Sequence, residues 1–594
     1  MFAAAHYAAL AVFVVSCWGC GRALLSRFGA PPRPDVWLAA AMATTLGVGL
    51  FVCAFQALAI AGVFGRAGVV ALVAAGLVAA ALQCPAWLRE LRELRELREL
   101  RAAPADAPFS ALDKVALAAL ALVALPTLMA PLAPPAVFDE LMYHLPYARQ
   151  VAESGSLGIH AWLRYPWFPY DYNLLFAAAL TVGDDVLPHF LSALAGWLSV
   201  GIVYRLGMQH TNRMIACVGA AIWLGLGDYA GALIDGGTAL FVLAACVALW
   251  WWRESPPQQG ARWLALAAFC LGVAAGSKYQ ALTFLPLVAL FVARHERRPR
   301  VWGVALLCFL IPCVYWYARN ALMTGDPFNP IGARLFGFTN WIPADYVQQV
   351  ADVHAHANPP NPLLWAFLWV PFGAAWKRSA AVRAAFWFGA YAVVVWLLTS
   401  RYPRYLSAAY PLIAICAALG WQRLLSGIAT HLHRAWPQHE AALARGGRAA
   451  LGLLMAVLVV FSAHQALARA RMISPTPQAR EAFLRANVPG YGVMSYLRAH
   501  PSPGRVYQVA LSEAIYYGPN PIWGDALGPW RYADFILLPA DQMARKLAAQ
   551  GFDTVVVSGP VAPALTGKPG FDRHFALLYQ EDGARAYRIL PTAP

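Results

Sequence analysis

Two adjacent carboxylates, Asp139 and Glu140, directly follow an apolar run long enough to cross a membrane. Ionisable groups at such a boundary are costly and usually mark a functional site. Helical spacing puts Asp139 and Tyr143 on one face, with Glu140 and His144 on the neighbouring face. A carboxylate here can take a proton from a hydroxyl nucleophile. On local sequence alone the alternative stays open: an interfacial helix with Asp139 as its N-cap.

Four basic residues lie beside later apolar runs, on the side of the membrane that carries few cations. Each alone is typical of an interfacial side chain whose charged end reaches water. Together, and near the acidic Asp235, they suit a phosphate group, which both Lys and Arg bind. These candidates are Lys278, Arg319, Arg401 and Arg404.

The elements that must position these residues are membrane helices. Hydrophobic residues make up 60% of the 594-residue chain and charged residues only 13%, against about 25% in ordinary globular proteins. The net charge is +15, but most arginines outside the C-terminal part lie in short loops between apolar runs. No basic, aromatic-interleaved soluble domain is present, which argues against a nucleic-acid-binding protein. All ten cysteines lie in or beside apolar runs, which predicts small core residues rather than disulfides or a metal site.

Runs of about 20 apolar residues predict about fourteen transmembrane helices. Four form an N-terminal block and ten follow a polar, aromatic stretch. They lie near 2–21, 36–62, 67–86, 112–133, 186–206, 214–227, 236–252, 262–275, 281–294, 301–318, 362–376, 384–400, 405–422 and 449–466.

The distribution of Lys and Arg predicts the orientation, because short cytoplasmic loops are enriched in them. It puts the loops 134–185 and 319–361, and everything after about 467, outside the cytoplasm. We expect four regions: extra N-terminal helices (1–87), a cytoplasmic helical linker with a Leu-Arg-Glu repeat (88–111), a catalytic membrane core (112–466) and a small extracytoplasmic α/β domain (467–594).

The C-terminal domain is predicted from its alternating pattern. We expect a helix over 481–500, a strand over 505–511, a helix over 541–550, a strand over 554–558 and a final strand pair near 575–579 and 586–590. The domain has no Gly-rich phosphate loop, so we expect a lid or an acceptor platform. Its aromatic pair Tyr516-Tyr517 could stack on a sugar.

The ordered motifs of the core resemble those of the GT-C membrane glycosyltransferases. They are Phe138-Asp139-Glu140-x-x-Tyr143-His144, then Tyr165-Pro-Trp-Phe-Pro169, Asp235, Gly-Ser-Lys278-Tyr, Arg319-Asn-x5-Asp326-Pro-Phe-Asn-Pro330 and Arg401-Tyr-x-Arg404-Tyr. The closest group is the family 39-like one, which includes protein O-mannosyltransferases and lipid A aminoarabinose transferases. The resemblance covers about residues 112–420; the three extra N-terminal spans and the lack of a clear acceptor motif depart from it.

The resemblance implies transfer of a sugar from a polyprenyl-phosphate donor to a glycan, lipid or protein acceptor, at the outer face of the bacterial inner membrane. Asp139 would be the base in a single inverting displacement, and Glu140 a second catalytic acid that stays protonated or orients its neighbours. Lys278, Arg319, Arg401 and Arg404 would bind the donor phosphate. Tyr143, His144 and Asp235 would line the site.

Alternatives stay open for the cofactor and for the class of function. No cofactor is assigned, but a divalent metal ion bridging Asp139, Asp235 and the phosphate stays open; Asp352-x-His354-x-His356 is interpreted as incidental. The alternative functions are a transporter or flippase of a lipid-linked sugar, against which the absence of an internal repeat argues, and a ligase or polymerase of surface polysaccharide. The sequence does not identify the sugar, the acceptor or the oligomeric state.

Overall fold

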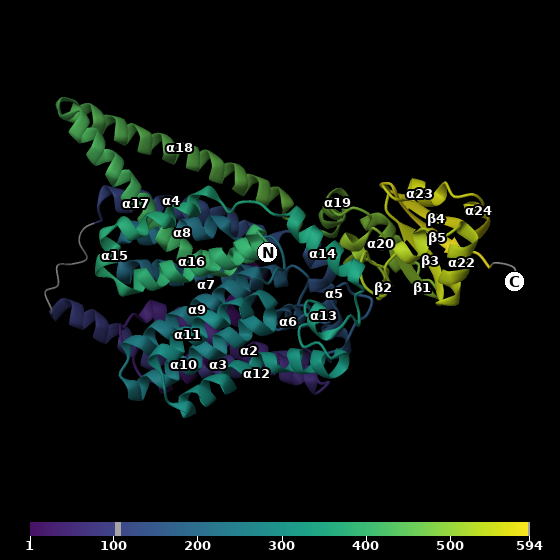
Figure 1. Cartoon of the computed structure of the whole chain (residues 1–594), viewed down its shortest axis with the longest axis horizontal. Helices are drawn as coiled ribbons and strands as arrows, with labels where there is room; N and C mark the ends of the chain where they lie inside the picture. The colour runs from purple at the N-terminus through teal and green to yellow at the C-terminus, as the bar shows by residue number, and fades with distance from the viewer. Residues whose placement is uncertain (101–108, 592–594) are drawn as a thin grey trace.

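The computed structural model describes residues 1–100 and 109–591. It has an elongated shape, with a body of long helices at one end and a small α/β domain at the other (Figure 1). In the described residues, eleven helices are long and apolar enough to cross a membrane. They are α1 (Phe2–Leu25), α2 (Val36–Ile60), α3 (Arg66–Leu100), α4 (Ala111–Met129), α7 (Leu187–His210), α9 (Asp235–Glu254), α10 (Pro257–Ser277), α12 (Pro299–Thr324), α16 (Ala380–Leu398), α17 (Tyr410–Ala435) and α18 (Glu440–Met472).

The prediction of a polytopic helical membrane protein is confirmed, and three of the expected spans are shorter than a membrane helix. The span at 214–227 is α8 (Arg213–Leu226), whose 14 residues reach about 21 Å, less than the roughly 30 Å hydrocarbon core. The span at 281–294 consists of the 3₁₀-helix η4 (Tyr279–Phe284) followed by α11 (Leu285–His295). The span at 362–376 consists of the 3₁₀-helix η5 (Pro362–Phe372) and α15 (Ala374–Arg378).

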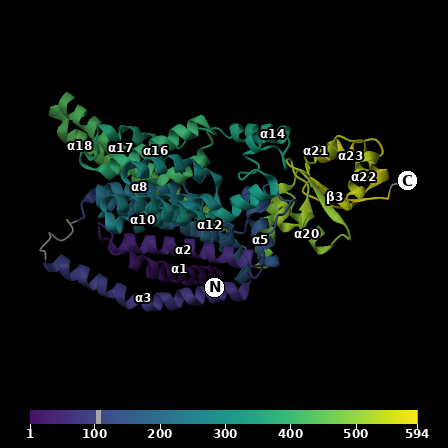
Figure 2. The ribbon, with the colours of Figure 1, turned by 60° about the horizontal axis from the view of Figure 1, so that its bottom comes forward.

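The first three helices form a layer along one side of the body (Figure 2). Helices α1 and α2 approach closely where Gly47 faces Cys17. The approach leaves no room for a side chain, since a Cβ at Gly47 would overlap the Cys17 carbonyl. Cys17 is fully buried there, as a small core residue. Helix α3 continues through the Leu-Arg-Glu repeat as far as Leu100, and Arg22 pairs with Glu90 at 2.5 Å. The remainder of the predicted linker up to residue 108 lies outside the described residues.

Arginines predicted to be cytoplasmic connect neighbouring helices near the ends that lie away from the α/β domain. The Asp35 side chain accepts hydrogen bonds from Trp37 N and Leu38 N and so caps α2, and it also pairs with Arg205 at 2.6 Å. Arg33 pairs with Glu254 at 2.9 Å. These contacts join the ends of α2, α7 and α9.

The C-terminal domain is a five-stranded sheet with helices, and its strand order is β2-β1-β3-β5-β4. Strands β1 (Arg505–Val509), β2 (Ile522–Trp523) and β3 (Phe552–Val557) are parallel, whereas β4 (Phe575–Glu581) and β5 (Ala584–Ile589) form an antiparallel hairpin paired to β3. Short helices connect the strands: α21 (Ala533–Ile536), α22 (Ala540–Ala549), α23 (Ala562–Thr566) and α24 (Phe571–His574).

The prediction for this domain is close, with two differences. The single helix expected over 481–500 is two helices, α19 (Pro477–Asn487) and α20 (Tyr491–Ala499), because Gly490 between them has φ +77°, a conformation that glycine adopts without strain. Strand β2 has only two residues, too few for an alternating pattern to be visible in the sequence.

The domain docks on the loops predicted to be outside. Arg164 pairs with the buried Asp525 at 2.7 Å, and Arg531 pairs with Asp345 on α14 (Pro343–Ala355) at 2.8 Å. Tyr517, in the 3₁₀-helix η8 (Ser512–Tyr517), donates a hydrogen bond to the Pro135 carbonyl at 2.6 Å. The idea that Tyr516-Tyr517 stacks on a sugar is therefore wrong, because both rings are buried in this interface.

Candidate active site

Asp139 lies at the turn between the end of the α4 span and the helix α5 (Leu145–Ser154). The expected α-helical turn is instead a π-helix, η3 (Glu140–His144), in which Leu145 N donates to the Glu140 carbonyl. The wider i→i+5 turn is typical of functional sites. It changes the side-chain directions that i,i+4 spacing predicts, so Asp139 and Glu140 enter separate networks.

Four charged side chains from four segments form one network. Arg404, on the 3₁₀-helix η6 (Pro403–Ala409), contacts the Asp139 carboxylate. Its Nε lies 2.9 Å and its Nη2 2.8 Å from Asp235 Oδ2. Lys278 Nζ lies 2.6 Å from Asp235 Oδ1. Two carboxylates and two cations thus balance in formal charge.

The network is partly open to a ligand, since its side chains keep between 15% and 26% of their surface exposed. Three of the four residues lie at or next to the ends of elements that cross the body. Asp235 is the first residue of α9, Lys278 follows the last residue of α10, and η6 leads directly into α17. The helices therefore fix the backbone at each charge, and the side chains meet where those helices end.

Aromatic rings form one wall beside the network. The Tyr143 and Tyr165 rings meet edge to face with centroids 5.1 Å apart, and Tyr165 stacks on Phe168 at 4.4 Å. The Tyr165 hydroxyl donates to Gln349 Oε1 on α14 at 3.0 Å. This wall connects the turn at Asp139 with the loop that holds the C-terminal domain.

His144 is buried behind Tyr143 and is a hydrogen-bond partner. Its Nδ1 lies 3.0 Å from the Asn173 amide nitrogen. Burial lowers the pKa of His144 to about 3, so the imidazole is neutral at physiological pH. A neutral, fully buried ring of this kind packs and orients its neighbours.

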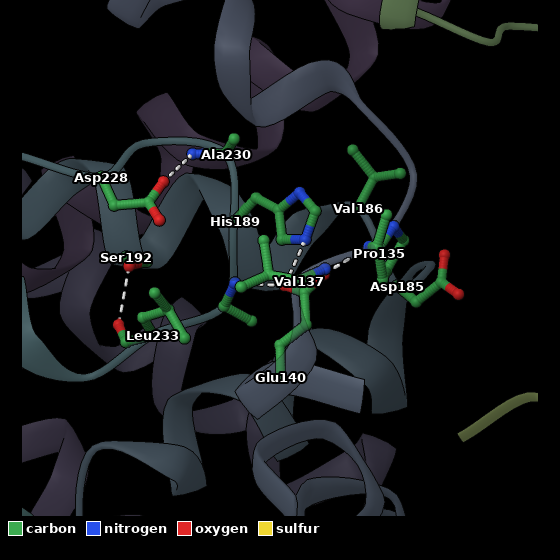
Figure 3. A network of polar contacts seen from close by, with 12 residues as sticks. Pro135, Val137, Glu140, Asp185, Val186, His189, Ser192, Asp228, Ala230 and Leu233 are labelled. Carbon is green, nitrogen blue, oxygen red and sulfur yellow. Dashed lines mark hydrogen bonds and ion pairs between the residues drawn. The ribbon is translucent and has the colours of Figure 1, made fainter. Parts of the chain in front are cut away.

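Glu140 takes part in a separate set of hydrogen bonds (Figure 3). Its side chain is fully buried and pairs with His189 at 3.0 Å. His189 is not among the residues predicted from the sequence. The sequence feature that could have indicated it is a histidine inside an apolar run, because an ionisable group there needs a partner.

Two of the four predicted phosphate-binding cations lie apart from the network. Arg319 is buried; its Nε and Nη2 donate to Asn320 Oδ1, at 3.1 and 2.9 Å. Its guanidinium also lies 5.0 Å from the Trp316 ring. Arg401 is exposed and has φ +52°. Within residues 1–100 and 109–591, neither arginine makes an ion pair with a carboxylate.

A metal ion does not fit this arrangement. In the described part of the chain no three His, Cys, Asp or Glu side chains are grouped as metal ligands. Asp139 and Asp235 already share Arg404, which a bridging cation would have to displace. His356 Nδ1 bonds the backbone carbonyl of Asp352 at 2.8 Å, so the Asp-His-His motif does not converge on one point. We assign no step to a metal.

Two families match parts of the chain. The family described as dolichyl-phosphate-mannose-protein mannosyltransferase matches residues 170–316, which include Asp235 and Lys278. The family described as SF2091/S2213 matches residues 479–588 of the C-terminal domain.

Two curated relatives come from Shigella flexneri. Uncharacterized protein SF2093/S2215 is 41% identical over 61 residues, which are 10% of this chain and 31% of that protein. Uncharacterized protein SF2092/S2214 is 26% identical over 147 residues, covering 22% of this chain and 79% of that protein. The chain thus spans less than a third of the first relative and most of the second.

Solved structures resemble about 80% of the chain. ArnT from Cupriavidus metallidurans in the apo state has a TM-score of 0.50 at 14% identity, covering 80% of this chain and 97% of that one. The Archaeoglobus fulgidus oligosaccharyltransferase with a tethered acceptor peptide has a TM-score of 0.45 at 15% identity, covering 80% and 74%. At this identity the likeness to ArnT shows the fold, and the predicted resemblance is confirmed at that level: the chain has a GT-C membrane fold.

Proposed function

We propose that this protein transfers a sugar from a polyprenyl-phosphate donor to a hydroxyl of an acceptor, outside the cytoplasm, with inversion at the anomeric carbon. The observation that carries the proposal is the network of Asp139, Arg404, Asp235 and Lys278. It combines a base with two cations at the end of a membrane body, which is the set of groups that this transfer needs.

The balanced charges suggest how the donor prepares the base. A donor phosphate would compete with Asp139 for Arg404, because Arg binds phosphate oxygens with several N–H donors. Asp139 would then be released from its cation, and its carboxylate could contact the acceptor hydroxyl. The base would become competent when the donor is bound.

The transfer step then follows in one displacement. The acceptor hydroxyl attacks the anomeric carbon, and its proton passes to a carboxylate oxygen of Asp139. The bond between the anomeric carbon and the phosphate oxygen breaks, and Arg404 and Lys278 stabilise the charge that develops on the released polyprenyl phosphate. Asp235 holds both cations in place through its two oxygens. Attack opposite to the leaving group inverts the configuration.

An apolar cavity supports a lipid-linked donor. It has a volume of about 320 Å³ and lies among α7, α9, α11, α16 and α17, with Trp250, Phe291 and Phe388 in its wall. Three of these helices continue from Asp235, from Lys278 through η4, and from Arg404 through η6. The cavity residues on them follow the charged residues by 8 to 15 positions, or about 12–22 Å along a helix. Isoprenoid units of a donor would lie in the cavity at this depth while the donor phosphate contacts the network.

Two further observations support the donor class and the side of the reaction. The matching family's description names a dolichyl-phosphate-linked mannose, and the chain has the fold of ArnT. The arginine pattern favours the cytoplasm for the ends of α2, α7 and α9, and therefore the outer side of a bacterial inner membrane for the network and the C-terminal domain. That domain would cover the site or hold the acceptor.

The test uses the purified full-length protein in detergent with polyprenyl-phosphate sugars and candidate glycan, lipid and protein acceptors. Mass spectrometry should detect released polyprenyl phosphate and an acceptor heavier by one sugar, and NMR of the product should show the inverted anomer. Movement of an intact lipid-linked sugar across vesicles, with no cleavage of any donor, would replace this proposal by a flippase.

A further inference from the structure

The Glu140 carboxylate connects three segments of the chain (Figure 3). Its Oε1 accepts hydrogen bonds from Ala136 N at 2.6 Å and Val137 N at 3.0 Å. Its Oε2 accepts from Ala232 N at 2.6 Å and contacts His189 Nε2 at 3.0 Å. Neither Glu140 nor His189 has any exposed surface.

These contacts occupy both carboxylate oxygens of Glu140. Three of the four partners are backbone N–H groups, which can only donate, and they use both carboxylate oxygens. The fourth partner is His189 Nε2, which contacts Oε2 as donor or acceptor according to the tautomer of the ring. Of the two roles expected for Glu140, these contacts support the one in which it orients its neighbours. With both oxygens engaged and no surface exposed, the carboxylate has no site left for a substrate proton.

The connected segments are those that carry the two acids of the network. Asp139 follows Val137 by two residues, and Asp235 follows Ala232 by three. Both segments are attached to α7, through His189 and through a second bond in which Ser192 Oγ donates to the Leu233 carbonyl at 2.7 Å. Nearby acids have other partners: Asp185 pairs with Arg480, and Asp228 accepts from Ala230 N.

We propose that Glu140 and His189 are positioning residues that hold Asp139 and Asp235 at the separation that Arg404 spans. This inference rests on the proposed function and assigns the second acid of the Asp139-Glu140 pair a role apart from the chemistry. We call the contacts of the Glu140 side chain with Ala136, Val137, Ala232 and His189 the bracket. Loosening the bracket moves the base relative to the bound donor, and a displacement of about 1 Å can cost about 100-fold in rate.

The test compares four variants of the full-length protein. Glu140→Gln keeps the size but turns an NH2 group toward a backbone N–H, and His189→Leu removes the hydrogen-bonding side chain. His189→Gln keeps a hydrogen-bonding side chain. Ser199→Ala is the matched control, since Ser199 is a buried polar residue of α7 that bonds only its own helix, at Ala195 O. Donor-binding sites are counted in each preparation, and kcat is expressed per site.

We expect Glu140→Gln and His189→Leu to lower kcat per donor-binding site by about 10–100-fold, with KM for the donor changed by less than about threefold. His189→Gln and Ser199→Ala should stay within about threefold of the unchanged protein. A residue needed only for stability would lower the number of sites and leave kcat per site unchanged, and that result would overturn the inference.

Gly231→Ala supplies a variant that removes no polar group. Its methyl group would lie 3.2 Å from Glu140 Oε2 and 3.0 Å from Val137 Cγ2, so it pushes the two segments apart. It should lower kcat per site in the same way, and full activity in this variant would contradict the bracket.

Hydrogen exchange tests the bracket without a measurement of transferase activity. The amides of Val137 and Ala232 should exchange at least about tenfold faster in Glu140→Gln than in Ser199→Ala. If no donor is ever cleaved, the proposed function fails while this measurement still supports or rejects the bracket. Unchanged exchange at both amides would reject it.

Discussion

At the scale of single residues, a substitution of Asp139 should slow transfer without preventing donor binding. Asp139→Asn keeps the size and a hydrogen-bonding group but removes the proton acceptor, so transfer should fall by about 10²–10⁴-fold while the donor still binds. The measurement is the single-turnover rate at saturating donor, with donor affinity measured separately. Asp352→Asn is the control, since Asp352 is an exposed acid of α14. Near-normal transfer by folded Asp139→Asn would return Asp139 to a structural role.

Two arginines three residues apart in sequence should behave differently. Arg404→Gln removes the cation that joins Asp139 to Asp235, and we expect donor affinity to fall by about 10–100-fold. Arg401→Gln removes an exposed cation outside the network and should change affinity by less than about threefold. Equilibrium binding of a radiolabelled polyprenyl phosphate compares the two. Equal losses would mean that Arg401 also reaches the phosphate.

The pKa of His144 predicts how the free energy of unfolding depends on pH. Its pKa is about 3 in the folded protein because of burial, against an ordinary 6.5, so the unfolded chain binds a proton that the folded chain refuses. The free energy of unfolding should therefore fall as pH drops from about 6.5 toward 3, by about 1.4 kcal/mol per pH unit. The Tm in detergent at pH 7.5 and 5.0 measures this. His144→Gln should weaken the dependence, and the exposed His500→Gln should not; identical slopes in all three proteins would contradict the assignment.

At the scale of elements, the apolar cavity makes the donor tail length matter. Ala385 on α16 lines the cavity, and Ala385→Phe would fill part of it. We expect at least about a fivefold loss of affinity for a long polyprenyl phosphate and little change for a two-isoprene analogue, since each buried CH₂ contributes about 0.8 kcal/mol. Ala380→Phe, at an exposed position of the same helix, is the control. An equal loss for both tail lengths would place the tail elsewhere.

The elements also explain how much of the site could be predicted. Asp139, Asp235, Lys278 and Arg404 each lie where an apolar run ends on the same side, so hydropathy and sidedness alone bring them near one another. Arg319 and Arg401 satisfy the same criterion, but sequence carries no information on side-chain direction. Glu140, in the π-turn, makes tertiary contacts with Ala232 N and His189 Nε2, which no local sequence pattern predicts.

At the scale of the whole molecule, the loop helices α5 and α14 and the α/β domain lie toward one end (Figures 1 and 2). We predict that Ser156→Cys and Asp582→Cys, in a background without the native cysteines, react with an impermeant thiol reagent added to intact cells. His439→Cys, between α17 and α18, should react only after the cells are opened. Labelling of Ser156→Cys and Asp582→Cys on opposite sides would refute the orientation.

The charge balance of the network also decides how a donor can find it. Two carboxylates and two cations leave no net monopole, so the resting site casts little field beyond about 10 Å in physiological salt. These four side chains by themselves would add little electrostatic steering for an anionic ligand in solution. Capture therefore depends on two-dimensional search within the bilayer: the isoprenoid tail confines the donor to the plane of the membrane, and local concentration replaces long-range attraction.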